Sequence, residues 1–160
     1  MAKLLRRVSL LSLLIWQSPA VAQIMLHDFW VRQMPPGASV NAAYGLIMNH
    51  GAQPVMITDV TSVAADRATL HETLQEDDRV RMKAVGQVTI EPGQTLALAP
   101  GGMHVMLMGL DTSRSVDGVL PICFLSKDST GHTDSVCTEA VTKAMVSPNG
   151  AVHSEQHQHH

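Results

Sequence analysis

Aromatic side chains are scarce in this chain of 160 residues, which has two Trp, one Tyr and two Phe but ten Met. We therefore expect the flexible thioethers of methionine to fill part of the core that rings fill in other proteins. Charged residues are also few, at 16% of the chain. A chain of this length is expected to form one domain.

Long hydrophobic runs are missing too. The apolar stretch from Val8 to Trp16 is too short to span a bilayer, so we expect no stable membrane insertion. Basic residues precede this stretch, and Ala20-Val21-Ala22 after it is a typical signal-peptidase site. The sequence therefore predicts a cleaved signal peptide at residues 1–22 and a periplasmic protein.

Positive charge is in short supply after residue 22, where 8 Lys and Arg stand against 14 Asp and Glu for a net charge of −6. This balance argues against nucleic acid and anionic membrane surfaces as partners. No nucleophile–base pair and no pair of carboxylates can be argued from the spacing of residues. We therefore expect no catalytic residues and no enzymatic activity.

Short alternating apolar runs, separated by turn signals, make up the body of the chain. The turn signals include Asn49-His50-Gly51, Glu91-Pro92-Gly93, Ala99-Pro100-Gly101-Gly102 and Asp128-Ser129-Thr130-Gly131. Many short strands at such spacing are typical of a β-sandwich or a Greek-key barrel. The sequence thus predicts an all-β domain over residues 23–147.

Four residues form the most informative pattern: His71, Met82, His104 and Met106. Imidazole suits several transition metals, but paired thioethers are soft donors that select monovalent copper. A hairpin centred between Glu76 and Asp77 would place His71 directly opposite Met82. His104 and Met106 are two residues apart and share one face of a strand. Two strand pairs, each carrying one His and one Met, would then close a site for Cu(I).

This spacing resembles the hallmark of the periplasmic PCu(A)C copper chaperones: His, ten residues, Met, twenty-one residues, His-x-Met. The resemblance covers roughly residues 25–143. Further segments that fit the family pattern in order are Trp30-Val31-Arg32, Pro35-Pro36-Gly37-Ala38, Ala43-Tyr44, Asn49-His50-Gly51, Leu70-His71-Glu72 and the block from Pro100 to Leu110. The resemblance implies a cupredoxin-like or immunoglobulin-like β-sandwich. It also implies delivery of copper to the copper-site subunit of cytochrome c oxidase, alongside a Sco-type protein.

The tail at residues 148–160 has no apolar periodicity, and we expect it to be flexible. It carries four of the nine histidines: His153, His157, His159 and His160. Imidazoles without thioethers favour Cu(II), so the tail is a candidate second copper site. A solubilising tail or a cloning remnant is the alternative interpretation.

The two cysteines, Cys123 and Cys137, lie on either side of Asp128–Gly131 and are not spaced as C-x-x-C. A hairpin centred on Thr130 places them opposite each other, and an exported protein favours a structural disulfide between them. Ligation of copper by their thiolates is the alternative. This pair departs from the PCu(A)C pattern.

Two other functions compete with the chaperone. A redox-active cupredoxin would need a Cys beside the His and Met ligands, and none lies close to His104 in sequence. An immunoglobulin-like interaction module would carry metal only on its tail. All four proposed core donors are neutral, and strong thiolate chelation is absent, so the pattern favours a carrier that releases copper by ligand exchange.

Overall fold

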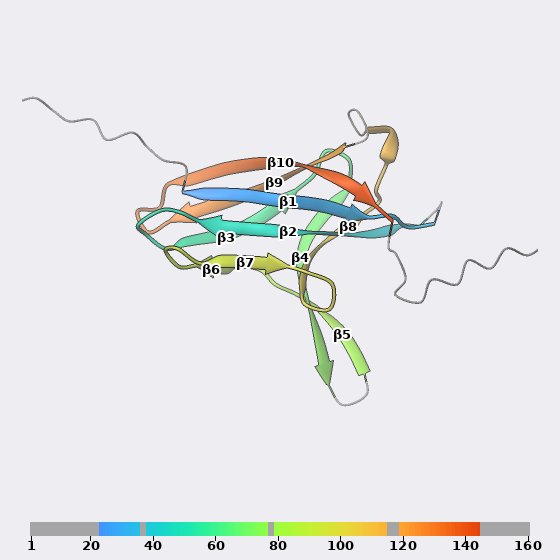
Figure 1. Cartoon of the computed structure of the whole chain (residues 1–160), viewed down its shortest axis with the longest axis horizontal. Coiled ribbons are helices and arrows are strands. Elements are labelled where there is room, and N and C mark those ends of the chain that lie inside the picture. Colours follow the sequence, from blue (N-terminus) through green and yellow to red (C-terminus); the bar gives the residue numbers. More distant parts are fainter. Residues whose placement is uncertain (1–22, 36–37, 77–78, 115–118, 145–160) are drawn as a thin grey trace, which may run out of the picture.

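The computed structural model describes residues 23–35, 38–76, 79–114 and 119–144. Ten strands account for most of them (Figure 1): β1 Ile24–Arg32, β2 Val40–Asn49, β3 Val55–Thr61, β4 Arg67–Glu76, β5 Arg79–Ala84, β6 Val88–Ile90, β7 Thr95–Leu98, β8 Met103–Met108, β9 Val119–Asp128 and β10 Thr133–Lys143. A single 3₁₀ turn, η1, covers Thr112–Arg114. The all-β prediction is confirmed. The described residues include no helix of the length and apolarity that crossing a membrane requires.

The strands follow one hydrogen-bonded path in the order β5-β4-β8-β2-β1-β10-β9-β3-β6, and β7 pairs with β2. The sheet is open, and it folds over one core so that β3 also contacts β4 without pairing with it. Phe29 on β1 meets Phe124 on β9 across this core, with ring centroids 5.4 Å apart. Alternate residues of β9 are buried, so the apolar residues that recur at every second position of this strand are the ones that face the core.

A β-bulge in β1 decides which side chains reach the outer face. The register against β2 shifts between His27 and Trp30, where Asp28 adopts a positive φ of 52°. Phe29 then turns inward, and its ring lies so close to Gly45 that a Cβ there would be 2.6 Å from it. Trp30 turns outward and packs on Tyr44, with ring centroids 4.6 Å apart.

The β4–β5 hairpin projects away from the rest of the fold (Figure 1). Every residue of β5 is exposed, because β5 is an end strand that pairs only with β4. The register places Thr73 opposite Met82 and His71 opposite Ala84. Our prediction that His71 lies directly opposite Met82 is therefore wrong. The last paired residues are Glu76 and Arg79, so the centre of the hairpin turn lies one residue later than predicted. This register sets Glu76 opposite Arg79 and Glu72 opposite Lys83, which are pairs of opposite charge.

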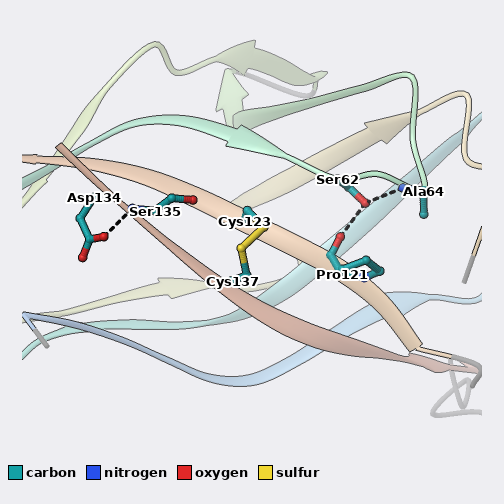
Figure 2. The surroundings of a disulfide bond; sticks show 7 residues. All are labelled: Ser62, Ala64, Pro121, Cys123, Asp134, Ser135 and Cys137. Carbon is teal, nitrogen blue, oxygen red and sulfur yellow. Dashed lines mark hydrogen bonds between the residues drawn. A yellow bond between two sulfur atoms is a disulfide. The ribbon is translucent and has the colours of Figure 1, made fainter. Parts of the chain in front are cut away.

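The β9–β10 hairpin has the predicted register. Cys123 lies opposite Cys137, and the two form a disulfide with their Cα atoms 4.0 Å apart (Figure 2). Asp128 organises the turn, since its Oδ1 accepts hydrogen bonds from the backbone N–H groups of Thr130 and His132, both at 2.9 Å. The local geometry of this turn thus accounts for the register that sets the two cysteines opposite each other.

The disulfide should stabilise the domain chiefly by constraining the unfolded chain. Its ends are 14 residues apart, and a loop of this size corresponds to about 3 kcal/mol in the chain-entropy model. We expect Cys123→Ser/Cys137→Ser to lower the free energy of unfolding by about that amount in urea titrations. Two free thiols in the denatured wild-type protein would contradict the pairing.

Candidate metal site on the β5-β4-β8 sheet

The four predicted ligands lie on three adjacent strands of one sheet. His71 is on β4, His104 and Met106 are on β8, and Met82 is on β5. Because β8 pairs with β4 in the register that sets His71 opposite His104, the two imidazoles are direct neighbours, with ring centroids 6.2 Å apart. Met106 lies opposite Thr69 in the same register. The four candidate ligands thus lie on one continuous sheet and not on the two separate strand pairs that we predicted.

A surface hollow of about 410 Å³ opens beside these imidazoles. Met82, His104 and Met106 line it, whereas His71 is a neighbour of His104 and is not part of the lining. The other lining residues are Arg32, Met34, Val40, Asn41, Ala42, Tyr44, Thr73, Pro100 and Gly101. Three of the predicted ligands therefore share one cavity, and the fourth adjoins it.

The turn before β8 holds His104 in place. Gly101 has a φ of 82°, a conformation that glycine adopts without strain, and the N–H of Gly102 donates to the Ala99 carbonyl at 3.0 Å. The Gly102 carbonyl then accepts the Nδ1 proton of His104 at 3.1 Å. The N–H of Thr73 donates to the same carbonyl at 3.2 Å, which ties β4 to the turn.

This hydrogen bond fixes the tautomer of His104. With the proton on Nδ1, the lone pair of Nε2 is left as the nitrogen available to a metal. The side chain is only 5% exposed, so the ring orientation is set by packing as well as by the hydrogen bond. A preoriented imidazole of this kind is what a metal site requires.

His71 carries a second unused nitrogen. Its Nε2 lies 3.0 Å from the hydroxyl oxygen of Thr69, whereas its Nδ1 is buried and has no hydrogen-bond partner among the described residues. When Nε2 donates its proton to Thr69, the lone pair on Nδ1 is left without a donor. A buried polar atom without a partner costs free energy, and a bound cation would remove that cost.

Electrostatics keep His71 in its ligating form. Burial lowers the pKa of His71 below its ordinary value of 6.5, and the neighbouring His104 lowers this pKa further. The neutral imidazole, which is the form that binds metal, is therefore favoured at neutral pH. Both effects follow from the β4–β8 register, which places two imidazoles side by side.

The two thioethers differ in exposure. Met82 is 59% exposed on the projecting β5, whereas Met106 is partly buried within the sheet. The described residues contain no cluster of three or more His, Cys, Asp or Glu side chains that could hold a metal. The side chains of Met82 and Met106 line the hollow together with His104.

Sequence reasoning missed several residues around the hollow. Thr69 lies two positions before His71 on the same strand face, so its contact with that ring could have been predicted from the period of a strand. Arg32, Met34 and Tyr44 had no such local signal, because they reach the site only through the pairing of β1 with β2 and of β2 with β8. The tail histidines and the predicted signal peptide lie outside the described residues.

The family model described as "Putative lipoprotein LpqE-like" matches residues 24–136. The curated protein "Putative lipoprotein Lxx21020" from Leifsonia xyli subsp. xyli is 38% identical over 88 residues, which are 54% of this chain and 52% of that protein. The chain thus spans about half the length of this curated relative.

Solved structures with a similar fold include copper-binding domains. The Cu(I) form of DR1885 from Deinococcus radiodurans is 29% identical, with a TM-score of 0.54 over 78% of this chain and 81% of that one. The copper-bound PCuAC domain from PmoF2 is 20% identical, with a TM-score of 0.61 over 79% of this chain and 97% of that one. These domains share the β-sandwich fold of this chain.

The lowered pKa of His71 predicts a pH-dependent stability. The unfolded chain binds a proton at His71 near pH 6.5, whereas the folded protein does so only at lower pH. Stability of the metal-free protein should therefore rise with pH across the interval between the two values. We expect the Tm of wild type to fall on acidification through this interval, and the Tm of His71→Asn to fall less. An NMR titration midpoint for His71 at or above 6.5 would contradict this prediction.

Proposed function

We propose that this chain, which belongs to the "Putative lipoprotein LpqE-like" family, is a copper chaperone that binds Cu(I) through His71, Met82, His104 and Met106. The observation that carries the proposal is the pair of adjacent imidazoles, each with one nitrogen free for a metal, beside a hollow lined by two thioethers. Copper is the cargo of this site and is exchanged with other proteins.

The donor set matches Cu(I) better than other metals. Soft thioethers select monovalent copper, and zinc, magnesium or calcium would prefer thiolate, carboxylate or water ligands. Among the described residues that line the hollow there is no Asp or Glu, so these side chains offer a harder divalent ion no charged oxygen. Neutral donors hold Cu(I) without cancelling its charge, which favours release to a site richer in anionic ligands.

The comparisons support this proposal at the level of copper binding. The DR1885 structure is that of the Cu(I) form, and the chain is 29% identical to it. We extend from this likeness to a copper-carrying role, which also agrees with the PCu(A)C spacing of the four ligands.

We place the protein in the cell envelope, where copper carriers for respiratory oxidases act. The lipoprotein description of its family and the signal-peptide pattern of residues 1–22 support this location. Both cysteines of the sequence are joined in the β9–β10 disulfide, so neither is free to carry a lipid. Recipients in the proposal are the copper-site subunit of cytochrome c oxidase and a Sco-type protein.

A cupredoxin-type electron carrier is the weaker proposal. Its copper requires a cysteine thiolate, whereas Cys123 and Cys137 are paired with each other on β9 and β10 (Figure 2). An interaction module with an incidental metal tail is also disfavoured, because the unpartnered Nδ1 of His71 lies in the body of the domain. Metal titration of a chain ending near Ser147 separates this third possibility from the chaperone.

Removing either sulfur should weaken Cu(I) binding selectively. We expect Met82→Ala or Met106→Ala to reduce Cu(I) affinity at least tenfold, about 1.4 kcal/mol, and to change Zn²⁺ affinity far less. Competition with a chromophoric Cu(I) chelator gives the affinities, and X-ray absorption counts nitrogen and sulfur donors, two of each.

Met25→Ala is the matched control, because Met25 is 53% exposed and belongs to no predicted ligand set. It should leave Cu(I) affinity unchanged. If both ligand variants bind Cu(I) within about twofold of wild type, the copper site is elsewhere in the chain.

The tail is proposed to hold Cu(II) separately from the core site. Deleting residues 153–160 removes His153, His157, His159 and His160. We expect this deletion to abolish any Cu(II) bound beyond the core site and to preserve Cu(I) binding. Isothermal titration with each ion measures both stoichiometries, and loss of Cu(I) binding on deletion would refute separate roles.

A further inference from the structure

Exposed apolar side chains gather around the hollow. Among the residues that the structure describes, seven large hydrophobic side chains are exposed. Met34, Val40 and Met82 line the hollow itself, and Val80 lies two residues before Met82 on the same face of β5. Val141 lies opposite Trp30, whose ring packs on Tyr44 at the edge of the hollow. These five residues form what we call the docking face.

Two cations border the docking face on one side. Arg32 on β1 lies opposite Lys143 on β10, and Arg32 also lines the hollow. The Lys143 ammonium lies 5.8 Å from the centre of the Trp30 ring. Within the described part of the chain, neither cation has a carboxylate within salt-bridge distance. The rim of the hollow therefore carries positive charge on a domain whose net charge is negative.

We propose that the docking face binds an acidic protein surface that exchanges copper with the hollow, an inference that rests on the proposed chaperone function. Exchange of ligands requires donors of both proteins to reach the ion together, so a partner must dock over the hollow. Apolar contacts around the hollow would exclude water there, and Arg32 and Lys143 would pair with carboxylates at the edge. The partner class is therefore an acidic copper-binding protein.

A second copy of this chain fits the face less well. In a two-fold symmetric dimer formed through the hollow, the same surface of both copies would meet. Such an arrangement brings Arg32 and Lys143 of each copy toward a surface that already carries positive charge. Like charges facing each other disfavour an interface, so charge complementarity selects an acidic partner over a dimer.

The test follows Cu(I) transfer from the loaded full chain to two synthetic peptides. Both peptides carry the same pair of cysteines, whose thiolates are the richer acceptor site, and a fluorophore that copper quenches. Glutamates flank the cysteines in one peptide, and lysines flank them in the other. We expect stopped-flow transfer to the acidic peptide to be about tenfold faster at low salt, and this preference to shrink at high salt. Arg32→Gln/Lys143→Gln should reduce the preference to under about twofold.

Lys83→Gln/Lys127→Gln is the matched control, since it removes the same charge from exposed positions outside the docking face. It should keep the preference for the acidic peptide. Equal transfer to both peptides by loaded wild type, or an equal effect of the two double variants, would overturn the inference and leave the chaperone proposal standing. Failure of the wild type to load Cu(I) would remove both. A concentration-dependent dimer that Val40→Lys dissociates would assign the face to a second copy.

Discussion

The register of β8 between β4 and β2 is the constraint on which the candidate site depends. Pairing with β4 sets His104 beside His71, and pairing with β2 sets Met106 opposite Ala42. A slip of one residue in β8 would turn His104 and Met106 toward the opposite face and bring Val105 and Leu107 out of the core. Burial of Val105 and Leu107 therefore also holds the candidate ligands in place. The register of β8 determines both the core packing and the geometry of the candidate site.

Local patterns were enough to predict the elements and one hairpin. The Asp128–Gly131 turn specifies its own geometry, and the Cys123–Cys137 pairing follows from it. The acidic segment at Glu76–Asp78 did not determine the register of the β4–β5 hairpin. Moving the centre of the turn by one residue changes the partner of Met82 by two residues, and Met82 stays on the same face of the hairpin. Alternation cannot distinguish these registers; charge pairing between Glu76 and the cations of β5 does.

Long-range pairing was not predictable from the sequence. No local signal indicates that β8 pairs with β4, or that β1 brings Arg32 and Met34 to the hollow. The four candidate donors were predicted from their residue types and spacing, and the period of a strand indicates which side of the sheet each of them faces. The residues that lie next to these four side chains were not predicted, because the order of the strands in the sheet depends on packing of the whole core. The second nitrogen of His71 and the carbonyl of Gly102 are details of that packing.

The exposure of Met82 has a chemical consequence. A thioether in contact with solvent is open to oxidants, and oxidation converts its sulfur to a sulfoxide, a polar group with a hard oxygen acceptor. Partly buried Met106 is better shielded. Of the two candidate thioether donors, Met82 is therefore the more sensitive to oxidative stress, and a methionine sulfoxide reductase in the same compartment would restore it.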